Sequence, residues 1–180
     1  MILSEKMKNS IVILYLLEKM DVPLPVHQIE QAALSHMDYF SLNETIHDLI
    51  DIRYIEGDQD ENITRYSLTE EGIQSLEYFE KQLPGDIRSG INDFVIANRQ
   101  RIKRDYETTA TYFKNIDTDD YVAKCALYED DAMLIELNIT VVSVNQAKLI
   151  CDNWKSNITK LYGSILENLI NTDHEKKTEG

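Results

Sequence analysis

Hydrophobic residues recur at helical spacing in the first part of the chain, and this pattern predicts three helices joined by short turns. The expected helices cover residues 5–20, a short segment from Pro25 to about Ala33, and residues 37–52. In the first helix the apolar residues between Ile11 and Leu17 widen the stripe so far that this helix should be central. The second has Pro25 in its first turn, where proline is tolerated. The third has one apolar stripe, formed by Leu42, Ile46, Leu49 and Ile50.

The segment after the third helix is polar and favours a hairpin. Two short strands are expected at residues 54–56 and 65–68, and the eight or so polar residues between them should form a loop. A further helix is expected over residues 70–82, with Ile73, Leu76 and Phe79 on one face. Three helices followed by a strand, a loop and a strand match a helix-turn-helix with a wing.

The second half begins with a long helix over residues 87–104 and then changes to strand spacing. The expected strands cover residues 108–113, 121–128 and 132–142. On the last strand, alternate residues are apolar and should face a core: Met133, Ile135, Leu137, Ile139 and Val141. Ser143 and Gln146 form a capping-box pattern, so a final long helix should begin there and cover the sheet.

Together these elements predict an α+β protein. Its parts are an N-terminal winged helix-turn-helix, a long linking helix and a C-terminal three-stranded antiparallel sheet covered by a long helix. The expected divisions are residues 1–83, residues 84–171 for dimerisation or effector sensing, and a disordered tail at residues 172–180. The final helix is longer than the sheet needs, and its excess length is expected to pair with a second subunit.

Net charge, hydropathy and cysteine content exclude several classes of function for this protein. The 180 residues carry a net charge of -14, which argues against a general binder of nucleic acids or anionic membranes. No apolar run is long enough to span a bilayer and no signal peptide is recognisable, so a cytoplasmic protein with no membrane partner is expected. Cys125 and Cys151 lack metal-ligand spacing and favour two free thiols in a reducing compartment.

The segment Arg65-Tyr66-Ser67-Leu68-Thr69-Glu70-Glu71-Gly72 resembles the end of the wing in winged-helix regulators of the MarR and PadR type. Thr69 can cap the following helix, and Glu70 and Glu71 suit its positive end. This resemblance covers residues 1 to about 83 and implies a DNA-binding transcriptional regulator that acts as a dimer. The whole chain also resembles a bacterial family known only as a domain of unknown function, whose members are predicted to be winged-helix regulators.

The residues on the third helix conflict with DNA binding. With the apolar stripe turned inward, the outward side chains are Ser41, Glu44, His47, Asp48 and Asp51. Three of these five are carboxylates, whereas a surface for the major groove should present Arg, Lys, Asn, Gln or Ser. Residues 1–83 hold six Lys or Arg against sixteen Asp or Glu, a net charge of -10, so this half supplies no excess of cations.

Two functional interpretations therefore stay open. In the first, double-stranded DNA is bound by a homodimer through eight residues of each chain: Ser41, Asn43, Glu44 and His47 at the bases, Arg53 and Arg65 at phosphates, and Arg101 and Arg104 as a clamp. The basic run that holds the last two can equally be a solvated helix end. In the second interpretation, the winged helix is a scaffold whose acidic helix face binds a protein partner and no DNA.

An enzyme is the third class. Glu44, His47, Asp48 and Asp51 form an E-x-x-H-D-x-x-D pattern that could hold a divalent metal, but no second copy completes the site, and a solvated face explains it better. The sequence has no glycine-rich phosphate loop, no nucleophile elbow and no spacing typical of a catalytic triad. We therefore expect no enzymatic activity, no cofactor and no metal site.

Two groups of residues in the C-terminal half have alternative interpretations. Cys125 and Cys151 lie on predicted apolar faces, so we expect core residues rather than a redox switch, which needs an accessible thiol of low pKa. The aromatic residues near the final helix can line an apolar effector pocket or fill a plain core: Tyr121, Tyr128, Trp154 and Tyr162.

Overall fold

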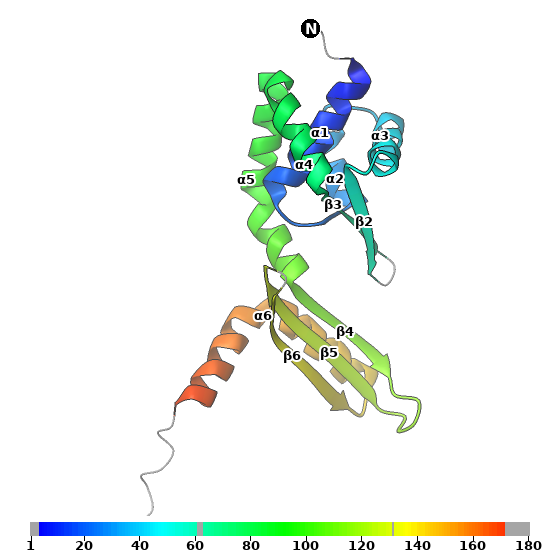
Figure 1. Cartoon of the computed structure of the whole chain (residues 1–180). Coiled ribbons are helices and arrows are strands. Elements are labelled where there is room, and N and C mark those ends of the chain that lie inside the picture. The colour runs from blue at the N-terminus through cyan, green and yellow to red at the C-terminus, as the bar shows by residue number, and fades with distance from the viewer. Residues whose placement is uncertain (1–3, 61–62, 131, 172–180) are drawn as a thin grey trace, which may run out of the picture. The chain divides into compact units, whose positions relative to one another are not determined.

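The computed structural model of the chain describes residues 4–60, 63–130 and 132–171 (Figure 1). The chain divides into two compact units, Met1–Lys103 and Arg104–Gly180. Each unit contains one three-stranded antiparallel sheet together with helices, so the predicted α+β class is confirmed. The tail expected at residues 172–180 lies outside the described residues.

The first unit is built around one buried helix. Its elements in chain order are α1 (Glu5–Met20), β1 (Leu24–Pro25), α2 (Val26–Ala33), α3 (Tyr39–Asp51), β2 (Ile55–Asp60), β3 (Ile63–Leu68), α4 (Glu70–Phe79), the short 3-10 helix η1 (Glu80–Gln82) and most of α5 (Gly85–Glu107). Every residue from Ile11 to Leu17 is buried, which confirms the predicted central position of α1. Ser4 caps the start of this helix by accepting a hydrogen bond from the amide of Met7.

The sheet of the first unit has the strand order β1-β3-β2. Strand β1 was not expected, because two residues are too few to show a period, and Pro25 ends this strand instead of lying inside α2. The expected loop of about eight polar residues is also wrong, since β2 and β3 pair through Asp58 with Arg65 and through Gln59 with Thr64. Polar residues can extend this hairpin because its outer part is not buried on both faces.

The junction between the hairpin and α4 is closely packed. As expected, Thr69 caps α4, its hydroxyl accepting from the amide of Gly72 at 3.1 Å; the same hydroxyl donates to the carbonyl of Arg53 at 2.7 Å. A Cβ atom at Gly72 would lie 2.0 Å from the carbonyl oxygen of Tyr54, so only glycine fits here. On α4 Leu76 is buried, but Ile73 is exposed, contrary to the predicted apolar face.

The first unit continues past the expected boundary at residue 83. Helix α5 contributes Ile91, Val95 and Ile102 to the core that surrounds α1. Two side-chain hydrogen bonds also tie it to α1, from Tyr15 to Asn92 at 2.9 Å and from Arg99 to the carbonyl of Met20 at 3.2 Å. The division between the units therefore falls near the end of α5.

The second unit is a sheet with one long helix across it. Its strands are β4 (Thr108–Lys114), β5 (Tyr121–Glu129) and β6 (Ala132–Val141), in that order across the sheet. Helix α6 (Val144–Ile170) follows, and Ser143 caps it at the amide of Gln146, as the capping-box pattern predicted. The core between sheet and helix consists of seven buried residues: Ala110, Ala123, Cys125, Ala147, Cys151, Trp154 and Ile158. The predicted sheet covered by a helix is thus present.

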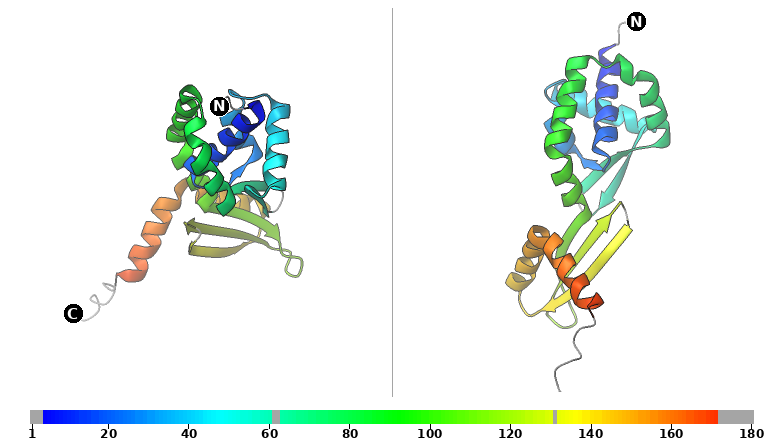
Figure 2. Two further views of the ribbon diagram at one scale, coloured as in Figure 1. Left: turned by 45° about the horizontal axis from the view of Figure 1, so that its top comes forward. Right: turned by 90° about the vertical axis from the view of Figure 1, so that its left-hand side faces the viewer.

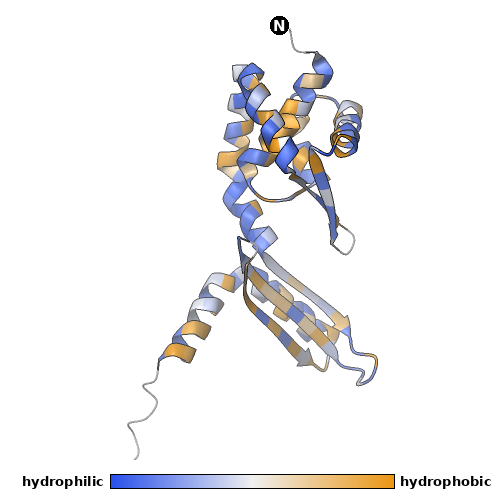
Figure 3. Ribbon diagram, in the orientation of Figure 1, coloured by the Kyte–Doolittle hydropathy of each residue, from blue (hydrophilic) through white to orange (hydrophobic). Residues whose placement is uncertain are grey.

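The C-terminal half of α6 extends beyond the sheet (Figures 1 and 2). Leu169 and Ile170 are 77% and 71% exposed, whereas Trp154 and Ile158, nearer the start of the helix, are buried. Hydrophobic residues are visible on the extending part of the helix (Figure 3). Strand β6 is incompletely covered as well, because Ile135 and Leu137 are half-buried and Met133, predicted to face the core, is exposed.

Candidate functional site

The candidate site of the first unit is the outer face of α3. Asp38 caps this helix by accepting hydrogen bonds from the amides of Phe40 and Ser41, and the Ser41 hydroxyl donates to the same carboxylate at 2.6 Å. The hydroxyl of Ser41, followed by these amides, lowers the pKa of Asp38. The buried side of the helix is formed by Leu42, Thr45, Ile46 and Leu49. The opposite side of the helix therefore faces solvent.

Lys6 of α1 reaches the acidic residues of this face. Its Nζ atom lies 2.8 Å from Oδ2 of Asp48 and 4.0 Å from Oε1 of Glu44. The bond to Asp48, more than the charge of Glu44, raises the pKa of Lys6, so the lysine stays protonated at neutral pH. One cation from a different helix thus offsets part of the negative charge that the sequence of α3 presents.

The four α3 residues predicted to contact bases differ in their availability. Glu44 and His47 are exposed, and Asp51 is exposed further along the same face. Ser41 is half-buried and its hydroxyl is directed to Asp38, while the amide of Asn43 donates to the carbonyl of Tyr39 at 2.9 Å. A new partner at either of these two side chains would have to compete with an existing hydrogen bond.

Arg53 and Arg65 lie near α3, on the segments that follow it. Arg53 comes two residues after the end of α3, is exposed, and has a left-handed backbone with φ of 61°. Arg65 is half-buried on β3, opposite Asp58 of β2 in the ladder. Both cations therefore stand at the hairpin that follows α3.

The basic end of α5 is partly engaged in the fold. Arg99 lies 2.9 Å from Asp21 in an ion pair, and Arg101 donates to Asn98 at 3.2 Å. Helices α5 and α3 lie on opposite sides of α1 (Figures 1 and 2), so the structure does not bring Arg101 beside the α3 face. Arg104 belongs to the second unit.

Sequence reasoning missed two aromatic residues on the α3 face. Phe40 is 83% exposed, and the ring of Tyr39 lies next to it with 6.0 Å between the ring centroids. Phe40 precedes Glu44 by four positions and His47 by seven, so the three form one stripe on the helix. This spacing could have placed Phe40 on the candidate face. Phe40 therefore adds an apolar contact surface to a face whose other residues are acidic or polar.

Of the four aromatic residues expected near the final helix, Trp154, Tyr121 and Tyr162 contribute to the core of the second unit, whereas Tyr128 is half-buried and outside that cluster. Trp154 is buried, and its indole nitrogen donates to the carbonyl of Ala126 at 3.2 Å. Tyr121 and Tyr162 are partly buried against the same cluster. Of the two alternatives, a plain core explains these residues, because a satisfied and closely packed indole leaves no space for an apolar ligand at this point.

The two cysteines are buried in this core, as expected. The Sγ atom of Cys151 lies 3.4 Å from the carbonyl oxygen of Thr111. Burial raises the pKa of Cys125 to about 11 and also raises the pKa of Cys151, although Lys155 acts in the opposite direction on both. Neither thiol is activated as a nucleophile.

Residues 4–60, 63–130 and 132–171 contain neither a cluster of metal ligands nor a membrane-spanning helix. There, no group of three or more His, Cys, Asp or Glu side chains is arranged to hold a metal ion. On α3, two of the carboxylates from the E-x-x-H-D-x-x-D pattern, Glu44 and Asp48, lie close to Lys6. In the same part of the chain, no helix combines the length and the hydropathy that a membrane crossing requires.

Comparison with family models identifies a relationship for almost the whole chain. A model described as "Domain of unknown function (DUF4364)" matches residues 9–169. The chain belongs to this family. The match runs from α1 into the last turns of α6, so the DUF4364 domain includes both compact units. The predicted membership in a domain-of-unknown-function family is confirmed, while the resemblance to MarR and PadR regulators stays a prediction. Neither the curated proteins nor the solved structures gave a match.

Proposed function

We propose that this DUF4364 protein is a DNA-binding transcriptional regulator whose first unit is a winged helix-turn-helix. The observation that supports this most strongly is the element order α1-β1-α2-α3-β2-β3 combined with the strand order β1-β3-β2. In a helix-turn-helix the second helix of the motif enters the major groove, and here that helix is α3. The β2–β3 hairpin then occupies the position of the wing.

The α3 face offers three kinds of contact with base edges. The carboxylate of Glu44 can accept a hydrogen bond from a cytosine amino group, and His47 can bond to a base acceptor. The exposed ring of Phe40 can pack on a thymine methyl group. Ser41 and Asn43 complete the set if their present intrahelical hydrogen bonds are exchanged. The ion pair with Lys6 lowers the repulsion that α3 would otherwise exert on phosphates.

Phosphate contacts are proposed for Arg53 and Arg65, because both stand on the segments that follow α3. The arginines at the end of α5 do not belong to this set. Arg101 is on a helix at the opposite side of α1, and Arg104 belongs to the other unit. With so few cations per chain, we expect a small dependence of affinity on salt.

We further propose that the regulator is a homodimer joined through the C-terminal half of α6. The apolar stripe of this helix continues past the sheet to Leu166, Leu169 and Ile170, which are exposed in the single chain. A second copy of the same stripe is a self-complementary partner for it. Dimerisation would double the DNA contacts of each chain.

A protein partner at the α3 face is the second candidate. Phe40 and Tyr39 are both exposed at one end of a face that also carries Glu44 and Asp51. Exposed aromatic residues are common anchors of protein interfaces, and the flanking carboxylates suit a basic partner. The same face cannot bind DNA and such a partner at once, so the two functions can be separated by experiment.

Fluorescence anisotropy of labelled DNA tests the proposal. The purified chain is titrated into a duplex from the region upstream of its own gene and into a scrambled duplex, each at two salt concentrations. Tighter binding to the upstream duplex, weakening as salt rises, is the result we expect. Absence of binding even at low salt would exclude the DNA proposal and leave the protein-docking function.

A further inference from the structure

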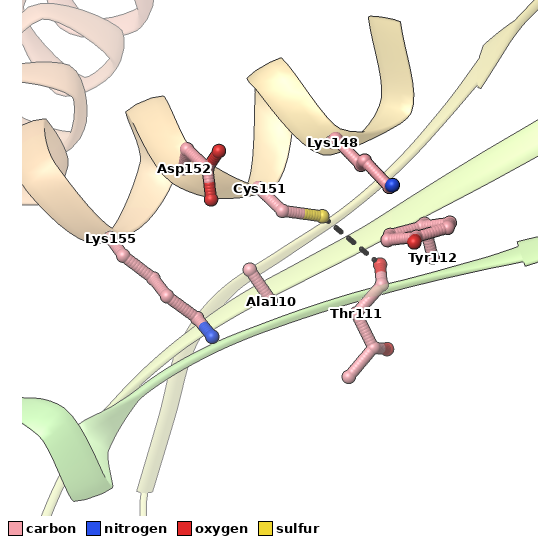
Figure 4. A pocket seen from close by; sticks show the side chains of 7 residues that line it. All are labelled: Ala110, Thr111, Tyr112, Lys148, Cys151, Asp152 and Lys155. Carbon is pink, nitrogen blue, oxygen red and sulfur yellow. Dashed lines mark hydrogen bonds between the residues drawn. The ribbon is translucent and has the colours of Figure 1, made fainter. Parts of the chain in front are cut away.

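Two adjoining pockets of the second unit share one lysine. The first has a volume of about 400 Å³ and lies between α6 and β4, where Lys148, Cys151 and Tyr112 are among its lining residues. The second has a volume of about 330 Å³ and is lined by Arg104, Asp105, Thr108 and Lys155. Lys155 also lines the first pocket. Figure 4 shows Lys148 and Lys155 extending from α6 on either side of Cys151.

The charge of these pockets contrasts with the charge of the chain. Each pocket has two cationic side chains against one carboxylate, in a protein whose net charge is -14. Within the described part of the chain, none of the three cations Arg104, Lys148 and Lys155 forms an ion pair with a carboxylate. Cations gathered in a concave surface without internal partners favour an external anion.

Thr108 gives an independent indication of a ligand. This residue is 5% exposed and lines the second pocket, and its Oγ1 atom is buried with no hydrogen-bond partner among the described residues. A buried hydroxyl without a partner is unfavourable, and in native structures such a group usually has an explanation. A ligand oxygen in the pocket would accept the hydrogen bond that the fold leaves unmade.

We propose that the pockets around Lys155 bind a small anionic ligand through a phosphate or carboxylate group. Arg104 offers two parallel N–H donors, Lys155 offers a point charge, and Thr108 offers a hydroxyl donor, a combination that suits an oxyanion. The rest of the ligand lies in the first pocket, where Lys148 and Tyr112 offer further polar groups. This assignment is independent of the proposed DNA contacts, since all of these residues belong to the second unit.

Isothermal titration calorimetry of the full chain tests this site. Inorganic phosphate and malonate are titrated separately, with ionic strength held constant by chloride. Saturable binding of phosphate alone assigns a phosphate group, and saturable binding of malonate alone assigns a carboxylate. Binding of neither anion overturns the proposal.

Two variants and one control locate the binding. Lys155→Gln should weaken the binding at least about tenfold, because a charge-assisted hydrogen bond is lost. Lys160→Gln removes the same charge from an exposed position of the same helix and should bind like the wild type. Thr108→Val removes only the hydroxyl and should weaken binding several-fold. Unchanged affinity in Lys155→Gln would overturn the proposal, and unchanged affinity in Thr108→Val would overturn the role of the hydroxyl.

Discussion

The Nζ atom of Lys6 on α1 lies 2.8 Å from the carboxylate of Asp48 on α3. These residues are far apart in sequence, and the ion pair forms only when α1 and α3 pack together. The ion pair reduces the negative charge that α3 presents to DNA, because the carboxylate of Asp48 is paired within the protein. Lys6 can be replaced without disturbing the core, since its side chain is largely exposed.

Replacing Lys6 by glutamine should weaken DNA binding several-fold at low salt. The variant leaves Asp48 and Glu44 without their cation, so α3 repels phosphates more strongly. The matched control is Lys8→Gln, which removes the same charge from α1 but breaks a pair with Glu5. Anisotropy titrations of the two variants test this. Equal losses of DNA affinity in both variants would show that only the net charge of the chain affects binding, and would contradict a role for the ion pair of Lys6.

Replacing Phe40 by alanine should weaken DNA binding at the α3 face several-fold without destabilising the fold. The ring is 83% exposed, so its loss should change the free energy of unfolding by no more than about 0.5 kcal/mol. Ile96→Ala is the control, because Ile96 is 82% exposed on α5, across α1 from α3. Affinity for DNA should fall in the first variant only. Wild-type affinity in Phe40→Ala would remove this residue from the interface.

Replacing Gly72 by alanine should destabilise the first unit by about 3 kcal/mol. The new Cβ atom would meet the carbonyl oxygen of Tyr54 at 2.0 Å, and backbone atoms must move to accept it. Gly163→Ala is a matched control, since Gly163 is also helical and nothing lies within 4 Å of its Cβ position. That variant should gain about 1 kcal/mol from helix propensity. Thermal melts followed by circular dichroism compare the two; a melting temperature unchanged by Gly72→Ala would contradict the described junction.

The thiols should be almost unreactive toward a disulfide reagent in the native protein at pH 8. With a pKa of about 11, only on the order of 0.1% of Cys125 is thiolate at that pH. Both thiols should react at once in guanidinium chloride. Rapid reaction of one thiol per native chain would contradict the buried positions of these residues.

The raised pKa of Cys125 also makes the free energy of unfolding depend on pH in the alkaline range. The unfolded chain releases the Cys125 proton near pH 9, whereas the folded chain holds it until about pH 11. The folded state therefore binds more protons in this window, and the cysteine contribution to the free energy of unfolding decreases as pH rises through it. A Cys125→Ala variant should lack this component of the pH dependence.

Replacing Leu169 by glutamate should convert the proposed dimer to a monomer. The charge would lie in the apolar stripe of the extending half of α6, where Leu169 is 77% exposed in the single chain. Ile116→Glu is the control, since Ile116 is exposed in the β4–β5 connection, at the end of the sheet where α6 begins and not on its C-terminal half. Light scattering after size-exclusion chromatography measures the mass. A monomeric wild type would contradict dimerisation through this helix.

The sequence predicted the elements whose apolar pattern continues over many residues. Helix α1 and the first half of α6 show uninterrupted stripes, and local capping at Thr69 and Ser143 set the beginnings of α4 and α6 as expected. Strand β1 was not predicted, because its pairing with β3 depends on residues distant in sequence and not on a pattern within β1 itself. Met133 shows the related limit, since alternation places it on a face but does not say how far the covering helix reaches.

The candidate site was predictable only where it depends on one helix. A helical wheel of α3 gives Glu44 and His47 as outward residues, and it would also have given Phe40. The Lys6 pair and the cation cluster around Lys155 could not be predicted, because each brings together residues from separate elements. Such contacts are determined by tertiary packing, which the spacing of residues within one element does not encode.

The most direct test of the central claim is to locate the DNA contact by nuclear magnetic resonance. The isotope-labelled full chain is titrated with its upstream duplex while the backbone amide signals are recorded. The account predicts that signals from α3 and from the β2–β3 hairpin shift together, with smaller changes in α5. Signals that stay in place throughout, or shifts confined to α5, would contradict the assignment of α3 as the helix that binds DNA.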